Sequence, residues 1–342
     1  MNSPLCTLAD IAKKIGMSSA TVSMALRNNP RISKKTRALV KKTAKSLGYH
    51  PDPLLSALAI RKRQSHTPRT FANLAFITDD RWRLQPNRGE WVDSVIGGMR
   101  ECCSHLGYEL DVFGMKELLN LGDPDRILSA RGIRGLVIPS LLKEDFKLQL
   151  DWDRYAVVAM GAHPTFHRFH RIGTDFFAGM GIVCSELARL GYRRVGLAHA
   201  YEIESNKRFE WLGALAKESY LVPQRIEPVP PHLPAAFTKD GYIRWIKTHK
   251  PECVISNEPL SLAYLKEAGI RVPEDIGYVA LSTARHAEKV AGVIINNSVL
   301  GEIAIMQLHG LILRGESGAS NPPKETLVCP MWTPWNTVRK IG

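Results

Sequence analysis

The chain has 342 residues, enough for two or three domains, and its 44% hydrophobic and 23% charged residues are typical of a globular protein. Its formal net charge is +13, and residues 1–63, with 13 Lys and Arg against Asp10 and Asp52, supply +11 of it. The sequence contains no apolar run long enough to predict a membrane span, and no secretion signal at its N-terminus. Its six cysteines are scattered, a pattern that predicts neither disulfide bonds nor a zinc site. We therefore expect a cytoplasmic protein with reduced thiols, no membrane association and no cofactor or metal.

The basic N-terminal segment is predicted to form three short helices. A capping box of Thr7 and Asp10 begins the first, which ends at Gly16. Ser18 or Ser19 caps the second, which continues to about Leu26, and a third runs from Ser33 to Gly48. Apolar residues recur at helical spacing along all three, namely Leu8, Ile11, Ala12, Ile15, Val22, Leu26, Val40, Ala44 and Leu47.

Two helices joined by a tight turn with glycine are typical of a helix-turn-helix, whose second helix enters the major groove of DNA. A solvated basic tail or a protein-binding bundle is the alternative. The second helix favours DNA, because it begins with small or hydroxyl-bearing side chains that fit closely into a groove. Basic residues that can meet phosphates flank it: Arg27, Arg31, Lys34, Lys35 and Arg37.

This segment resembles the DNA-binding headpiece of the lactose-repressor (LacI/GalR) family; it reads TLADIAKKIGMSSATVSMALRNNPRISKKTRALVKKTAKSLGYHPD. By the resemblance, Ser19, Ala20 and Met24 hold the main base-reading positions. None of them can form a bidentate pair with a base, so we expect contact with thymine methyl groups and readout of DNA shape. The predicted DNA-binding residues in the headpiece are Thr7, Ser18, Ser19, Ala20, Thr21, Ser23, Met24, Arg27, Asn28, Arg31 and Ser33.

The following stretch, PDPLLSALAIRKR, resembles the hinge of that family. The resemblance implies a short helix that forms on the operator and wedges Leu58 into a central base step of the minor groove. The alternative is that Leu58 packs against the body of the protein.

The remaining chain alternates apolar strand-like runs with amphipathic helical stretches, a pattern that predicts parallel sheets covered by helices on both faces. The predicted fold class is an all-α helix-turn-helix headpiece followed by an α/β core of two doubly wound lobes. No nucleotide-binding, hydrolase or metalloprotease motif is present, so we do not expect an enzyme. The three histidines of GAHPTFHRFH have no standard metal-ligand spacing.

The core resembles the effector-binding core of the same family, which is like a periplasmic sugar-binding protein; the clearest stretches are ELARLGYRRVGL and GIRVPEDIGYVAL. The resemblance implies a chain that crosses between its lobes three times. The predicted domains are 1–50 for the headpiece, 51–69 for the hinge and linker, and 70–342 for the core. Within the core, the first lobe is expected at about 70–162 and 290–320, and the second at about 163–289 and 321–342.

The effector is expected between the lobes, and the family makes a sugar-like small molecule the first expectation. Some positions depart from that pattern, because Glu210 stands where sugar-binding members usually have Arg, and Glu258 replaces Asp. Phe176 is a further candidate for the pocket. The predicted effector-binding residues are Asp79, Trp82, His163, Arg208, Asn257 and Ser282.

Since one helix-turn-helix reads only half of a two-fold site, we expect a homodimer on palindromic operator DNA. The ending NTVRKIG shows no leucine heptad of the kind that makes some members tetramers. The sequence predicts an effector-controlled transcription regulator, a repressor at the bacterial nucleoid. The rivals are an activator, an effector-independent regulator with a vestigial pocket, and a binding protein or enzyme with an incidental headpiece.

Overall fold

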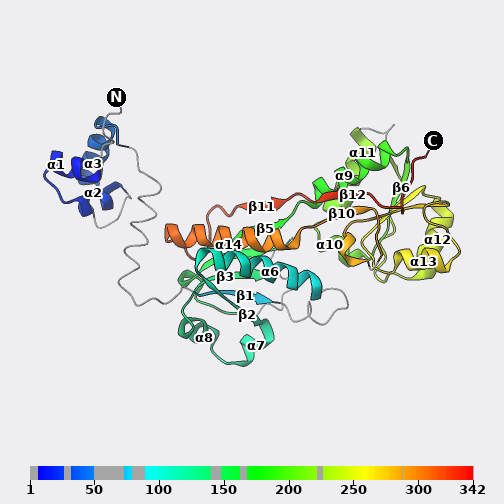
Figure 1. Cartoon of the computed structure of the whole chain (residues 1–342), viewed down its shortest axis with the longest axis horizontal. Helices are drawn as coiled ribbons and strands as arrows, with labels where there is room; N and C mark the ends of the chain where they lie inside the picture. The colour runs from blue at the N-terminus through cyan, green and yellow to red at the C-terminus, as the bar shows by residue number, and fades with distance from the viewer. Residues whose placement is uncertain are drawn as a thin grey trace. The chain divides into compact units, whose positions relative to one another are not determined.

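A computed structural model describes residues 7–26, 32–49, 73–78, 89–139, 148–161, 168–221, 226–286 and 288–341. The chain divides into two compact units, Met1–Arg69 and Thr70–Gly342. Figure 1 shows helices in the described part of the first unit, and sheets with their covering helices in the second.

The first unit is a bundle of α1 (Leu8–Ile15), α2 (Ser19–Leu26) and α3 (Lys34–Ser46). The predicted capping box of Thr7 and Asp10 is confirmed, and Gly16 ends α1 in the left-handed conformation with φ 64°. Ile11, Val22, Ala25 and Val40 are fully buried between the helices. This small core accounts for the helical spacing of the apolar residues.

The second unit contains two six-stranded sheets. The first sheet has the order β11-β5-β4-β3-β1-β2 and is parallel throughout, and the second has the order β12-β10-β9-β8-β6-β7, with β12 antiparallel to β10. The predicted class of two doubly wound lobes is confirmed. The strands are β1 (Asn73–Thr78), β2 (Glu109–Gly114), β3 (Ile133–Pro139), β4 (Ala156–Met160), β5 (His170–Thr174), β6 (Arg194–Leu197), β7 (Glu227–Pro228), β8 (Cys253–Ser256), β9 (Gly277–Ala280), β10 (Gly292–Ile294), β11 (Glu325–Val328) and β12 (Met331–Thr333).

Helices cover both faces of each sheet, as apolar strands buried on both sides require. On the first sheet, α6 (Gly89–Leu106) and α14 (Asn297–Arg314) pack together over one face, and α7 (Met115–Asn120) and α8 (Pro124–Ala130) contribute to the other. On the second sheet, α9 (Phe176–Arg189) and α11 (Glu210–Leu221) cover one face, and α12 (Lys239–His249) and α13 (Ser261–Glu267) cover the other. Short helices occur at α10 (Tyr201–Ser205), η1 (Trp152–Arg154) and η3 (Thr283–Arg285).

Glycine permits the close approach of α6 to α14. A Cβ atom on Gly98 would collide with the backbone carbonyl of Ser298, and one on Gly301 with the backbone carbonyl of Val95. Gly97, the neighbour of Gly98, faces open space. The glycines at 98 and 301 therefore set how closely these helices pack.

The chain passes between the two sheets three times through very short connections. Asp175 alone joins β5 to α9, residues 295–296 join β10 to α14, and residues 329–330 join β11 to β12. The lobe boundaries expected from the sequence are therefore wrong in detail. β5 belongs to the first sheet and not to a second lobe beginning at 163, β10 belongs to the second sheet, and β11 belongs to the first.

The physical reason is that all three strands are short, and that β5 and β11 also carry polar residues. His170 and Arg171 give β5 no apolar signal, although all five of its residues are buried. Across the described part of the chain, no helix is both long and apolar enough to cross a membrane.

Candidate nucleic-acid interface and effector site

The start of α2 is fixed by hydroxyl groups. The Ser18 Oγ accepts a hydrogen bond from the Thr21 backbone N–H at 3.1 Å and lies 2.9 Å from the Thr21 Oγ1. Of the two capping residues expected, Ser18 is therefore the one that caps. Both hydroxyls already take part in bonds that hold the helix end, which reduces their capacity to read bases.

The predicted base-reading residues lie along this helix. Ser19 is exposed, Thr21, Ser23 and Met24 are half-buried, and Ala20 lies in the same helix. Val22 and Ala25 are fully buried on the opposite side. Arg27, Asn28, Arg31 and Leu58 lie outside the described residues.

Two predicted contacts are helix caps. Thr7 caps α1, and the Ser33 Oγ caps α3 by accepting from the Thr36 N–H at 3.1 Å. Caps of this kind leave the first backbone N–H groups of a helix near the surface, where they suit a phosphate. These positions therefore fit contacts that place the helices on DNA without reading its sequence.

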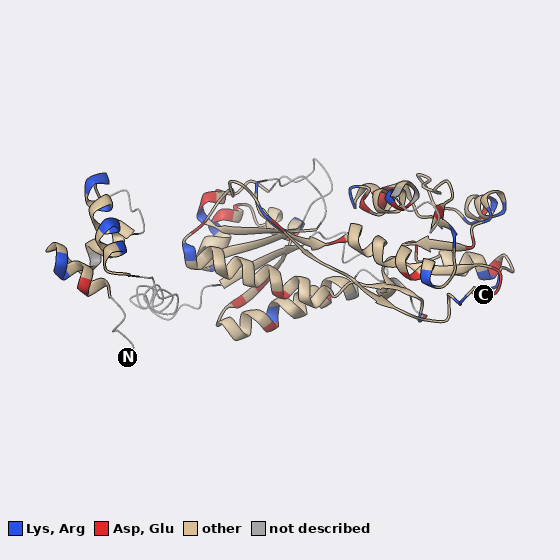
Figure 2. Ribbon diagram, turned by 90° about the horizontal axis from the view of Figure 1, so that it is seen from above, with Lys and Arg blue, Asp and Glu red and all other residues tan. Residues whose placement is uncertain are grey.

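Positive charge dominates the first unit. Figure 2 shows the Lys and Arg residues of this unit in blue along its helices. Asp10 is the acidic residue between positions 7 and 49, and its hydrogen bonds with the Thr7 hydroxyl and N–H lower the pKa of its carboxyl group. The surface therefore suits a polyanion at neutral pH.

Two of the predicted effector residues follow strands of the second sheet at their carboxyl ends, and a third lies farther along the chain. Asn257 comes directly after β8 and is 5% exposed, and Ser282 follows the neighbouring strand β9. Arg208 lies between α10 and α11, after β6. Ligands of doubly wound sheets bind at this edge.

The other predicted effector residues, Asp79, Trp82 and His163, lie outside the described residues. Phe176 packs in the core of the second lobe, where its ring meets that of Trp211 edge-on at 5.1 Å.

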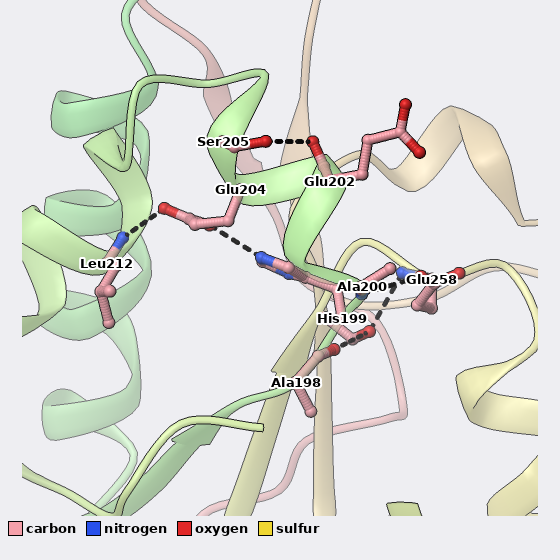
Figure 3. A network of polar contacts seen from close by, with 9 residues as sticks. Ala198, His199, Ala200, Glu202, Glu204, Ser205, Leu212 and Glu258 are labelled. Atoms are coloured by element: carbon pink, nitrogen blue, oxygen red, sulfur yellow. Dashed lines mark hydrogen bonds and ion pairs between the residues drawn. The ribbon is translucent and has the colours of Figure 1, made fainter. Parts of the chain in front are cut away.

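A hydrogen-bonded network ties the carboxyl ends of β6 and β8 together (Figure 3). The Glu258 carboxylate accepts from the Ala200 N–H at 3.0 Å, and the Ser256 hydroxyl donates to the Ala198 carbonyl at 2.6 Å. His199 and Glu204 form a completely buried pair, with 2.7 Å between Nε2 and Oε2. The second oxygen of Glu204 accepts from the Leu212 N–H at 2.8 Å. This carboxylate therefore fixes the segment that carries Arg208.

Arg208 connects the two lobes. Its Nη1 lies 3.6 Å from Oε1 of Glu325, which is on β11 of the first sheet. The Arg171 guanidinium, 9% exposed, holds the same carboxylate at 3.1 and 2.5 Å. Arg208 and Phe209 both have positive φ, at 59° and 58°. Two such residues in succession are costly for non-glycine side chains, and strain of this kind clusters at functional sites.

Glu210 lies among these charges. Burial raises the pKa of its carboxyl group, the positive charges of Arg208 and Arg171 oppose this shift, and Asp175 and Glu325 add to it. An acid in this environment is sensitive to any change in the positions of the two arginines. Within the described ranges, no cluster of three His, Cys, Asp or Glu residues suits a metal ion.

Sequence reasoning missed the Arg171–Glu325 pair and the His199–Glu204 pair. The first joins residues 154 positions apart, for which a single sequence has no signal. The second joins residues five apart, but nothing in YEIES distinguishes the buried Glu204 from the exposed Glu202.

Residues 7–52 match the family model described as bacterial regulatory proteins, lacI family. The chain is 28% identical over 198 residues to the HTH-type transcriptional regulator Rv3575c of Mycobacterium tuberculosis, covering 56% of this chain and 51% of that protein. It is 35% identical over 104 residues to the regulator MalR of Staphylococcus xylosus, of which it spans 28%. It is also 24% identical to the repressor MelR of Bacillus subtilis, across 82% of this chain and 83% of that one.

Solved structures share the fold over nearly the whole chain. The lac repressor dimer bound to operator and the anti-inducer ONPF has a TM-score of 0.56 at 15% identity, covering 98% of this chain and all of that one. A complex of the regulator CelR with cellobiose has a TM-score of 0.55 at 18% identity, covering 97% and 99%.

Proposed function

Because the chain is a transcription regulator of the LacI family, we propose that it represses transcription by binding a palindromic operator as a homodimer under the control of a small-molecule effector. Its relatives are transcription regulators, in agreement with the expectation that it is not an enzyme. The observation that carries the proposal is the geometry of α2, which exposes Ser19 and buries Val22 and Ala25 within a strongly basic unit.

Operator recognition would rest on shape and apolar contact more than on hydrogen bonds. The Ser18 and Thr21 hydroxyls are bonded to the helix end, and Met24 offers only an apolar surface and a weak acceptor. Counterion release by the basic unit supplies affinity for any duplex. The Leu58 wedge is proposed to add the kink that distinguishes the operator.

The effector is proposed to bind at the carboxyl ends of β6, β8 and β9, near Arg208, Asn257 and Ser282, with Asp79, Trp82 and His163 contributed from the other parts of the core. The positive φ of Arg208 and Phe209 supports this placement, because the strain is held by the buried Glu204 network. The cellobiose named for one structural relative supports a sugar-like ligand. Binding would change lobe closure and thereby the operator affinity.

The DNA-binding proposal is tested by selecting duplexes from a random library with the full-length protein and measuring their affinity. We expect a palindrome bound by a dimer, with affinity reduced at least tenfold by Leu58→Ala and unchanged by the surface control Leu260→Ala. Selection of no common sequence would contradict the proposal.

The effector proposal is tested by thermal melting with a panel of sugars, nucleobases and other metabolites. A ligand that raises the melting temperature of the wild type, but not of Arg208→Met, supports the site. If no metabolite shifts the melting temperature or the operator affinity, the alternative of an effector-independent regulator is favoured. Activation or repression follows from the position of the operator and is decided by a reporter assay.

A further inference from the structure

The third helix of the first unit carries five lysines on one face, which we call the lysine stripe: Lys34, Lys35, Lys41, Lys42 and Lys45. At 3.6 residues per turn these positions fall within an arc of about 120°, and their 1.5 Å rise gives the stripe a length of roughly 17 Å. All five side chains are exposed. Val40, Thr43 and Ala44 on the opposite face are buried in the bundle.

Among the described residues, no carboxylate is paired with a lysine of the stripe. Residues 32–49 contain no Asp or Glu, and none of the ion pairs among the described residues includes these five lysines. Lys41 and Lys45 are four residues apart, a spacing at which like charges destabilise a helix. Lys34 and Lys35 lie in the first turn, where the helix dipole already disfavours positive charge. The arrangement therefore weakens α3 until an anion lies along it.

The shape and charge of the stripe fit the backbone of duplex DNA. One strand places a phosphate about every 3.4 Å along the axis, so the stripe spans the axial length of about five phosphates. Lysine binds phosphate as a point charge and tolerates variation in position, which suits contact without sequence preference.

Lys34 and Lys35, at the start of the stripe, flank α2, whereas Lys41, Lys42 and Lys45 lie about two to three turns farther along α3. Each of the three helices contacts the other two around one core, so their outward faces diverge. A straight duplex held along the exposed start of α2 therefore does not also run along the length of the stripe.

We propose that Lys41, Lys42 and Lys45, the far part of the lysine stripe, bind the phosphate backbone of a second duplex segment while α2, flanked by Lys34 and Lys35, holds the operator. The inference rests on the proposed binding of an operator by α2, and it gives the protein the capacity to hold two DNA segments at one headpiece. It differs from looping by tetramers, because it needs no further subunit.

The test is capture of one duplex by another through the full-length protein. A palindromic duplex selected by the wild type is fixed to beads and saturated with protein, and a fluorescent 30-base-pair duplex of scrambled sequence is added. The stripe variant is Lys41→Gln/Lys42→Gln/Lys45→Gln, because glutamine preserves helix propensity. The matched control removes the same charge from exposed positions of the second unit, as Lys247→Gln/Lys250→Gln/Lys340→Gln.

We expect the stripe variant to lose capture of the second duplex at least tenfold while its operator affinity changes less than threefold. The slope of log affinity against log salt for the second duplex should become shallower by about 2.7, for three phosphate contacts at about 0.9 each. The control variant should capture like the wild type. Circular dichroism and melting of both variants establish that they are folded.

Several results would overturn the inference. Unchanged capture by the stripe variant would mean that the two headpieces of a dimer bridge the duplexes without α3. Equal loss in the control would assign capture to net charge. A parallel fall in operator affinity would place the stripe on the operator itself. Wild-type protein that binds the operator but captures no second duplex, and instead binds phosphatidylserine vesicles or an acidic peptide through the stripe, would assign the face to another partner. Failure of the wild type to bind the selected palindrome would contradict the proposed function instead.

Discussion

The buried carboxylate of Glu204 is expected to hold the segment that connects β6 to α11. Glu204→Ala removes the partner of the His199 Nε2 and of the Leu212 N–H, both of which lie within hydrogen-bond distance of its two oxygens. Leaving a buried polar group without its hydrogen-bond partner costs about 1–3 kcal/mol, and His199 is as completely buried as Glu204. Because two groups lose their partner, we expect the second unit to lose about 2–6 kcal/mol of unfolding free energy.

Glu204→Gln should cost much less. The amide oxygen can still accept from the Leu212 N–H, and the amide nitrogen can donate to a neutral His199 ring. We expect a loss of about 1 kcal/mol, the usual net value of a hydrogen bond. Glu202→Ala is the matched control on the same short helix, because its exposed side chain contributes none of the bonds drawn in Figure 3. Its effect should stay within about 0.5 kcal/mol.

The assay is urea unfolding followed by tryptophan fluorescence, to which Trp211, 5.7 Å from the His199 ring, contributes. Amide exchange at Leu212 gives a local measurement, and its protection should fall most in Glu204→Ala. A loss below about 1 kcal/mol for Glu204→Ala, or equal losses for Ala and Gln, would refute the claim that paired burial makes this carboxylate important.

Three further outcomes are expected. Gly98→Ala should destabilise the core by about 1–3 kcal/mol, because the new Cβ atom would collide with the Ser298 backbone. Gly97→Ala, which faces open space, should instead stabilise α6 by up to about 1 kcal/mol. Urea unfolding of both variants measures the difference. The pKa of Glu210 is raised in the folded protein, so the wild type should lose stability as the pH rises above 4.5 and this carboxyl group ionises. Glu210→Gln cannot ionise and should therefore gain stability relative to the wild type over the same range. Melting temperatures of the two proteins that change in parallel from about pH 4 to 8 would contradict this. Ser33→Ala should cost α3 about 1 kcal/mol, measured by amide exchange in the first unit, and Ser33→Asp should restore it.

The headpiece was predictable because its signals are local. Thr7, Gly16 and Ser33 mark helix ends through bonds that reach three or four residues along the chain. The long helices and the buried strands of the core were predictable for the same reason, since each shows its own periodicity. The placement of Asn257 and Ser282 followed from their positions after β8 and β9.

The remaining features depend on contacts between distant segments. β5 is a strand because β4 and β11 flank it, and its Arg171 is buried because Glu325 arrives from the far end of the chain. The link from Arg208 to the same carboxylate has no counterpart in the sequence near either residue. A periodic pattern records which side of an element is buried, but it does not record which partner buries it.

The three connections between the sheets limit how the lobes can move. Each contains one or two residues, namely Asp175, residues 295–296 and residues 329–330. At about 3.5 Å per residue, none has slack to let the lobes slide or separate by more than a few ångströms. The movement that such short tethers permit is a rotation of one lobe against the other about an axis close to them. In such a lever, a few degrees of change in the tether dihedrals become a displacement that grows with distance from that axis.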